Sequence, residues 1–327
     1  MRARFDWIIA DFILQEGATM SSPKPSNRSQ SLPGEACHHA PSLKELVSMT
    51  LAEDIGSGDV TAALIPAKTM GEGIFVAKSE GRLSGLKTAR EVFRQLAPRA
   101  TFTAMMRDGD PFSPGDQLAS VRASVRVLLT GERTALNFLQ QLSGVATMTS
   151  RFIEALGSDS PIHVFDTRKT VPLLRALQKE AVLHGGGRNH RMGLFDMALI
   201  KNNHVDACGS VTAAVARLAE DGFFKRKPRL KLCVEARDNN EAREAAACGA
   251  DIIMLDNMSA SEIRRAVEVI ENETRSSGNP PPEIEISGGI TPTALRRMRN
   301  LPIQRVSAGA LTHSAPAADI SFRIRPL

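Results

Sequence analysis

The chain has 327 residues, of which 42% are apolar and 24% charged, a composition typical of a soluble globular protein. This length favours two domains over one or three. The net charge of +5 is spread thinly, and the chain has no tyrosine and only one tryptophan. A nucleic-acid partner is therefore not expected, because neither a basic cluster nor a set of stacking aromatic side chains is present.

Residues 1–41 are predicted to form a disordered extension. From Ser21 to Pro41 the chain is rich in proline and serine and has too few apolar side chains to offset the entropy of ordering. A short apolar run near the start is interrupted by Asp11, so an export signal is not expected. Met20 is a candidate start of translation.

The four cysteines show no CxxC spacing, which favours a reducing compartment. We therefore expect a cytoplasmic protein with no membrane partner. Cys37 is followed by His38 and His39, but no second cluster of ligands lies at a suitable spacing, so a metal site is not expected there.

Ordered structure is predicted to begin with a helix at Ser42, which has the spacing of a capping box with Glu45. Short β-like runs separated by Gly/Pro turns follow between about residues 71 and 127. Helical periodicity returns over Gly131–Leu156, and its buried face is expected to consist of Leu136, Leu139, Leu142 and Val145. These patterns predict an N-terminal α/β domain over residues 42–144.

Beyond residue 160, a unit of one short apolar strand and one helical segment repeats. The strands are expected directly before Asp166, Lys201, Glu235, Asp256, Ser287 and Ser307. Such alternation is typical of parallel β/α architecture. We expect an open or closed α/β barrel over 145–312, and a smaller N-terminal α/β sandwich domain joined by the C-terminal segment of about 313–327. Because catalytic groups in such barrels lie at the carboxyl ends of strands, these residues are expected at one barrel mouth.

Cations are concentrated after the first of these strands. Arg168 can bind a carboxylate bidentately, whereas Lys169 and Lys201 are point charges suited to phosphate. His190 and Arg191 follow three glycines that could form a flexible loop over a ligand. The pattern indicates a basic pocket for a small di-acidic molecule beside a sugar phosphate.

Small residues follow the last two strands, at Ser287-Gly288-Gly289 and Ser307-Ala308-Gly309. Their backbone N–H groups are candidates for binding a phosphate. Glu235 and Asp256 follow neighbouring strands and could hold Mg²⁺ with a pyrophosphate, or could act as an acid/base couple. Nearby cations favour the ionised form of both carboxylates and hence the electrostatic role.

From about residue 42 onward, the sequence resembles the nicotinate-nucleotide pyrophosphorylase (carboxylating) family, also called quinolinate phosphoribosyltransferase. The matching stretches are EDIGSGDVTAALIP, GERTALNFLQQLSGVAT, DTRKT, GGGRNHRMGLFDMALIKNNH, VEARD, IIMLDN, ISGGI and SAGALTHSAPAADISFRI. The resemblance implies phosphoribosyl transfer from phosphoribosyl pyrophosphate to quinolinate, with loss of CO₂, in de novo NAD biosynthesis. It also implies a homodimer, and leaves assembly beyond the dimer open.

The resemblance further implies a set of site residues. Arg168, His190 and Arg191 would bind quinolinate together with Arg133 of the second subunit, and Lys169 and Lys201 would bridge both substrates. The implied catalytic residues are Lys169, Lys201, Glu235 and Asp256, with Mg²⁺ at Glu235 and Asp256. The complete substrate-binding set is Arg133, Thr167, Arg168, Lys169, His190, Arg191, Lys201, Glu235, Asp256, Ser287, Gly288, Gly289, Ser307, Ala308 and Gly309.

Three positions depart from the usual pattern of the family. Val171 stands where threonine is usual, Leu173 where glycine commonly follows the proline, and Glu180 where tyrosine is usual. Since these positions flank the implied site, its geometry or affinity could differ from that of the family.

Three other functions stay open. The first is a paralogue of the same fold associated with molybdenum transport, against which the GGGRNHR run and Arg133 argue. The second is a Schiff-base lyase that uses Lys201 or Lys169. The third is a non-catalytic sugar-phosphate binding protein, for which Glu235 and Asp256 would be superfluous.

Overall fold

The computed structural model describes residues 40–157, 159–227 and 230–327. These residues form two compact units. The larger unit comprises Ala40–Met192, Ile290–Arg299 and Ser307–Leu327, and the smaller unit comprises Gly193–Gly289 and Asn300–Val306. All but the last two residues of the predicted disordered extension, including Cys37 and the two histidines after it, lie outside the described residues.

Helix α2 (Leu43–Ile55) begins as the sequence predicts, with Ser42 as its N-cap. The Ser42 hydroxyl accepts a hydrogen bond from the Glu45 N–H (3.3 Å), and the Glu45 carboxylate accepts one from the Ser42 N–H (2.8 Å). This reciprocal pair satisfies two N–H groups that a helix start leaves without a partner. The buried face of the helix consists of Leu46, Val47 and Leu51.

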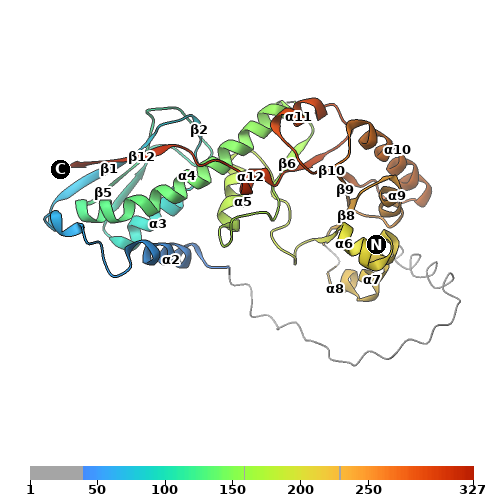
Figure 1. The fold of residues 1–327 in the computed structure, drawn as a ribbon, viewed down its shortest axis with the longest axis horizontal. Helices are drawn as coiled ribbons and strands as arrows, with labels where there is room; N and C mark the ends of the chain where they lie inside the picture. The colour runs from blue at the N-terminus through green and yellow to red at the C-terminus, as the bar shows by residue number, and fades with distance from the viewer. Residues whose placement is uncertain (1–39, 158, 228–229) are drawn as a thin grey trace, which may run out of the picture. The chain divides into compact units, whose positions relative to one another are not determined.

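The larger unit contains an antiparallel sheet, which is visible in Figure 1. Strand β1 (Met70–Ala77) pairs with β12 (Ile320–Pro326) on one side and with β5 (Gln117–Ser124) on the other, and β3 (Thr101–Ala104) pairs with β5. The C-terminal strand therefore belongs to the same sheet as the N-terminal strands. The shorter elements near this sheet are η1 (Ala62–Leu64), β2 (Gly81–Arg82) and β4 (Pro111–Phe112).

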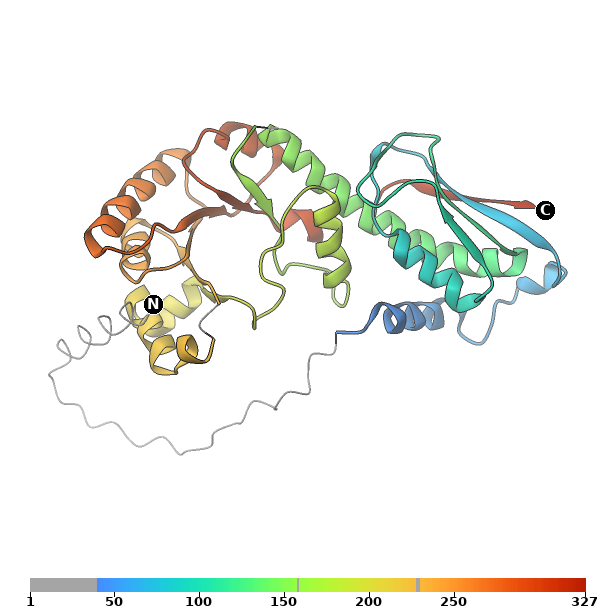
Figure 2. The same cartoon turned by 180° about the vertical axis from the view of Figure 1, so that it is seen from behind.

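Two helices pack against each other and against this sheet, α3 (Leu86–Leu96) and α4 (Val125–Leu156). Figure 2 shows them from behind, running along the strands. The predicted buried face of α4 is confirmed, since Leu136, Leu139, Leu142 and Val145 are all buried. The 32-residue helix runs without a break through the predicted domain boundary after residue 144, and that boundary stays a prediction.

The larger unit also holds one strand and several helices whose adjoining loops carry part of the candidate site. These are β6 (His163–Phe165), α5 (Arg175–His184), α11 (Pro292–Met298) and α12 (Ala310–His313). Residues after the glycine run return to β6, because the Arg188 N–H donates to the Val164 carbonyl (2.8 Å) and the Asp166 N–H donates to the Arg188 carbonyl (3.1 Å). The chain before His190 is thereby fixed to the end of β6.

The smaller unit is built on parallel strands in the order β11-β10-β9-β8-β7. The strands are β7 (Ala198–Ile200), β8 (Leu232–Ala236), β9 (Ile252–Asp256), β10 (Glu283–Ser287) and β11 (Arg305–Ser307), of which Arg305 and Val306 belong to this unit. The helices are α6 (Asn202–Cys208), α7 (Val211–Glu220), α8 (Phe223–Arg226), α9 (Asn239–Ala247) and α10 (Ala260–Ser277). The predicted α/β class with a parallel sheet and an N-terminal sheet domain is confirmed.

Strands β6 and β7 end directly before Asp166 and Lys201, as predicted. Strands β9, β10 and β11 each continue one residue beyond the predicted end, to Asp256, Ser287 and Ser307. The prediction that a strand ends before Glu235 is wrong, because β8 continues to Ala236 and Glu235 is itself buried within the strand. The alternation of apolar residues could not reveal this, since a carboxylate paired with a lysine can be buried where a lone one could not.

No helix in the described ranges is long and apolar enough to cross a membrane. Cys208 and Cys248, two of the cysteines within those ranges, are free thiols.

Candidate active site

Arg168 lies in the loop after β6, and one of its side-chain N–H donors has no acceptor among the described residues. Arg168 is half-buried, and its Nη1 atom is buried with no hydrogen-bond partner among the described residues. The Thr167 hydroxyl accepts from the Lys169 N–H (3.0 Å) and so shapes the loop from within. A buried guanidinium nitrogen without a partner is costly unless a ligand supplies an acceptor, which favours an anion at this position.

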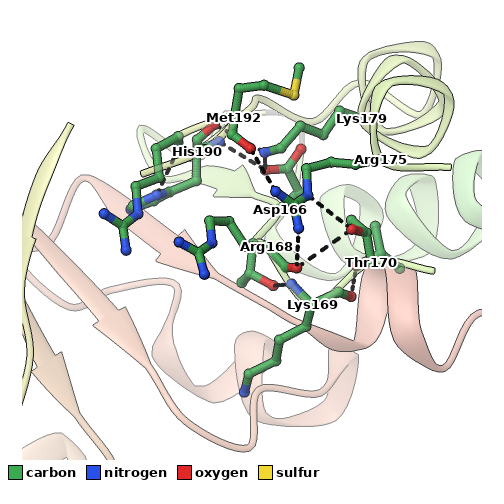
Figure 3. A network of polar contacts seen from close by, with 12 residues as sticks. Asp166, Arg168, Lys169, Thr170, Arg175, Lys179, His190 and Met192 are labelled. Carbon is green, nitrogen blue, oxygen red and sulfur yellow. Dashed lines mark hydrogen bonds and ion pairs between the residues drawn. The ribbon is translucent and has the colours of Figure 1, made fainter. Parts of the chain in front are cut away.

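Lys169 lies beside the turn that follows β11. Figure 3 shows its side chain running from the loop in a different direction from that of Arg168. Its ammonium group is exposed and has no hydrogen-bond or ion-pair partner in the described part of the chain. The turn is held there because Ala308 N–H donates to the Phe165 carbonyl (3.0 Å) and Thr312 Oγ1 donates to the Lys169 carbonyl (2.7 Å).

Gly309 lies close to the Lys169 side chain. A Cβ atom at Gly309 would lie 2.9 Å from Lys169 Cδ and 3.0 Å from His313 Nε2, so a larger residue would make these side chains shift. The Gly309 N–H donates no hydrogen bond within the described residues. A free N–H next to a free ammonium group is a suitable arrangement for a phosphate oxygen.

His190 is buried, and its backbone is fixed by Asp166. The His190 N–H donates to Asp166 Oδ1 (2.9 Å). The Arg191 N–H donates to His190 Nδ1 (2.9 Å), which makes that nitrogen an acceptor and selects the tautomer with the proton on the other nitrogen. The structure therefore brings His190 and Arg191 to the same β6 end as Arg168, as the sequence predicts.

Asp166 has a buried partner, Lys179 on α5, which was not predicted from the sequence. Both side chains are fully buried and form an ion pair. Burial raises the pKa of the Asp166 carboxyl, and Lys179 and the His190 N–H oppose that rise. A signal was present in the sequence, because Lys179 lies three residues before the apolar Val182 and so shares a helix face with it.

Arg133 lies on α4, exposed, with no hydrogen bond or ion pair to any described residue. On either side of it, two carboxylates bind threonines of the same helix. Thr134 Oγ1 donates to Asp54 (3.3 Å), and Thr130 Oγ1 donates to Asp59 (3.1 Å). Asp54 and Asp59 thus fix the EDIGSGD segment to α4 on both sides of Arg133. The sequence alone did not indicate this role for the two carboxylates.

In the smaller unit, Lys201 and Glu235 bind each other. Lys201 Nζ donates to Glu235 Oε2 (2.7 Å), and their side chains are 47% and 6% exposed. They lie at the carboxyl ends of the neighbouring strands β7 and β8. The lysine therefore reaches solvent while its partner stays within the strand.

Asp256 is held by its neighbours at the ends of β9 and β10. Ser287 Oγ donates to Asp256 Oδ1 (2.7 Å), and Asn257 Nδ2 donates to Asp256 Oδ2 (2.8 Å). Gly288 has φ 92° and a Cβ atom there would overlap the Asn257 amide, so glycine is required. The N–H groups of Gly288 and Gly289 donate no hydrogen bond within the described ranges.

No group of three or more His, Cys, Asp or Glu side chains within the described residues could hold a metal ion by itself. The donor set that the sequence predicts consists of two carboxylates, Glu235 and Asp256, on the adjacent strands β8 and β9. This set fits Mg²⁺ in the form in which water and substrate phosphate supply the remaining oxygens.

The three departures from the family pattern have distinct structural consequences. Val171 lines a cavity of about 530 Å³ with residues of α2 and α4. Leu173 has φ 65° in a turn that the Leu174 N–H closes onto the Val171 carbonyl (3.1 Å). With Pro172 before it, this is the pattern of a type II turn, whose third position favours glycine. Glu180 forms an exposed ion pair with Lys87.

The fold and these groups define a class: an α/β protein whose strand ends carry unpaired cations, free glycine N–H groups and a pair of carboxylates. The quinolinate phosphoribosyl transferase N-terminal domain model matches residues 59–143, and the C-terminal domain model of the same name matches residues 145–323. The chain belongs to the quinolinate phosphoribosyl transferase family.

Individual relatives agree with this assignment. The chain is 37% identical over 282 residues to a probable nicotinate-nucleotide pyrophosphorylase [carboxylating] of Bacillus subtilis, covering 86% of this chain and 93% of that protein. It is 37% identical over 305 residues to a chloroplastic enzyme of that name from Arabidopsis thaliana, covering 88% and 84%. The crystal structure of NadC from Streptococcus pyogenes has a TM-score of 0.80 and 41% identity, covering 87% of this chain and 97% of that one.

Proposed function

We propose that this protein transfers the phosphoribosyl group of phosphoribosyl pyrophosphate to quinolinate and releases pyrophosphate and CO₂, giving nicotinate mononucleotide for de novo NAD biosynthesis. The single observation that carries the proposal is the buried, unsatisfied Arg168 Nη1 beside the fixed His190-Arg191 segment. Quinolinate is a dianion, so a loop that holds guanidinium donors in place before binding suits it. Family membership and the names of the relatives support the same reaction.

The chemistry follows from where charge develops. Nitrogen of quinolinate bonds to C1 of the ribose as the C1–oxygen bond breaks, and the electron pair leaves with pyrophosphate. Glu235 and Asp256 would stabilise the positive charge that develops on the ribose, and Lys169 and Lys201 the negative charge of the leaving group. The ring nitrogen becomes cationic, so it accepts the electrons when the adjacent carboxylate departs as CO₂, and a proton then replaces that carboxylate.

The glycine turns would hold the 5′-phosphate of the ribose. Ser287-Gly288-Gly289 and Ser307-Ala308-Gly309 both present N–H groups that no described residue uses. Mg²⁺, held by Glu235 and Asp256 with water and pyrophosphate oxygens, would supply charge neutralisation of the leaving group. The cytoplasmic location stays a prediction, since one relative is named chloroplastic.

The other functions have weaker support. The ion pair with Glu235 favours an electrostatic role for Lys201 over that of a Schiff-base nucleophile. The relatives are named as carboxylating enzymes, which does not favour a transport-associated paralogue.

The activity is tested with the purified full chain, quinolinate, phosphoribosyl pyrophosphate and Mg²⁺. We expect CO₂ and nicotinate mononucleotide in equal amounts, and an increase in KM for quinolinate of about 10- to 100-fold in Arg168→Ala, since charged hydrogen bonds are worth about 1.5–3 kcal/mol. Arg151→Ala is the matched control, because Arg151 is exposed on α4 and has no partner among described residues. Absence of both products from the wild type would contradict the proposal.

We further propose a homodimer in which Arg133 acts in the site of the second subunit. Its exposure and lack of a partner within the described chain support this role. Mixing Arg133→Ala with Lys201→Ala subunits should then restore part of the activity, because hybrid dimers contain one intact site. No recovery despite demonstrated subunit exchange would place Arg133 in the site of its own chain.

A further inference from the structure

Helix α5 presents two cations one helical turn apart, Arg175 and Lys179, and neither was among the predicted site residues. Residues four apart lie on the same face of a helix. Each of the two side chains contacts both the segment after β6 and the segment around His190 (Figure 3). Together they join the two loops that carry the proposed quinolinate ligands.

Lys179 forms the buried connection. Its ammonium group pairs with Asp166 Oδ1 and donates to the His190 carbonyl (3.0 Å). Because the His190 N–H also donates to Asp166 (2.9 Å), both polar groups of the His190 backbone are fixed by one ion pair. The Asn189 side-chain amide satisfies its hydrogen bonds when its nitrogen faces these two residues. In that orientation the nitrogen donates to Asp166 Oδ2 (2.6 Å) and to the Lys179 carbonyl (2.9 Å).

Arg175 forms a second connection nearer the ligand loop. Its guanidinium donates to Thr170 Oγ1 (3.1 Å) and to the Arg168 carbonyl (3.4 Å) on one side. On the other side it donates to the Met192 carbonyl (3.1 Å). Arg168 and the residues after His190 are thus bonded to the same side chain.

Stability alone does not explain a fully buried pair such as Lys179–Asp166. The cost of removing two charges from water can equal or exceed their attraction, and apolar residues of similar volume are often as stabilising. What an apolar pair could not do is bind the N–H and C=O of His190 at once. The geometry of these contacts favours a role in fixing backbone position.

We propose that Arg175 and Lys179 are positioning residues that set the distance between Arg168 and the His190-Arg191 segment, and thereby the affinity for a pyridine dicarboxylate. The inference rests on the proposed function of this site. Because the contacts of the two residues are with the loops that carry Arg168 and His190, we expect them to act on binding of quinolinate more than on binding of phosphoribosyl pyrophosphate.

The test is equilibrium binding of quinolinate alone, which needs no turnover, together with KM for each substrate. Arg175→Gln should weaken quinolinate binding about tenfold, because displacements of about 1 Å in a site have effects of this order or larger. KM for phosphoribosyl pyrophosphate should stay within about twofold of the wild-type value. Arg175→Lys should be intermediate, since an ammonium group can reach one of the carbonyls. Arg151→Gln on α4 is the matched control.

The buried connection is tested with the double variant Asp166→Leu/Lys179→Met, which removes both charges together. It should weaken quinolinate binding, and it should lower the free energy of unfolding less than Lys179→Met alone, which leaves the Asp166 charge buried without its cation. If this variant fails to fold, quinolinate binding by Arg175→Gln and Arg175→Lys alone decides whether the proposal stands.

Two outcomes would overturn the proposal: wild-type quinolinate binding in Arg175→Gln, or an equal loss for both substrates, which would indicate a general structural role. A wild type that binds quinolinate and responds to Arg175→Gln but forms no product would instead refute the proposed reaction and leave the positioning role standing.

Discussion

The loop after β6 and the strand ends of the smaller unit carry the same kinds of residue in opposite states. In the loop, Arg168 and Lys169 have no side-chain partners among the described residues, while the backbone around them is fixed by Arg175 and Thr312. At the strand ends, the predicted site residues bind one another, as Lys201 binds Glu235 and Ser287 binds Asp256.

The difference indicates two ways of preparing a site. The loop is ordered before a ligand arrives, so an anion gains contacts without displacing any. At the strand ends, a substrate must share or replace an existing bond, so the net gain on ground-state binding is smaller. Interactions of this second kind contribute mainly where new charge develops in the reaction.

The largest effect is expected when the ion pair that fixes the loop after β6 is broken. Lys179→Met leaves Asp166 buried without its cation and should lower the free energy of unfolding by about 3–5 kcal/mol. The matched change at the exposed Lys87–Glu180 pair, Lys87→Met, should cost about 0–1 kcal/mol. Urea unfolding measures both. Similar losses in the two variants would mean that the buried pair has no special part in ordering the loop.

The second effect concerns the paired strand ends. Glu235→Gln should lower kcat about 10²-fold and change KM for quinolinate little, because the charge is needed mainly as the ribose becomes cationic. Steady-state kinetics with both substrates measures kcat and KM separately. Glutamine has nearly the same shape as glutamate, so the packing of β8 is kept. A large rise in KM at unchanged kcat would show that Glu235 contributes to ground-state binding instead.

The smallest effect is expected on stability, from substitutions at Leu173 in the loop after β6. Leu173 holds a left-handed conformation, which costs a non-glycine residue about 1–2 kcal/mol. Leu173→Gly should therefore stabilise the protein by about 0.5–1 kcal/mol after the larger unfolded-state entropy of glycine is subtracted. Leu173→Ala keeps the unfavourable φ angle and should give no gain. Equal midpoints of thermal unfolding for glycine and alanine would show that the turn is unstrained.

Much of this protein follows from the sequence by itself. The Ser42–Glu45 capping box depends on local spacing, and the structure has it where it was predicted. The strands expected before Asp256 and Ser287 are also present, and each extends one residue further than predicted. The fold class follows for the same reason, since alternating strands and helices limit the chain to few architectures.

Only the tertiary structure decided which charges are paired. Lys179 and Asp166 are 13 residues apart, and Lys201 and Glu235 are 34 apart, so sequence spacing does not distinguish them from the unpaired Arg168 and Lys169. Pairing depends on where α5 packs against the end of β6 and on the register of β7 with β8. Local chemistry selects the residues that can bind an anion, and long-range packing determines which of them are left free to do so.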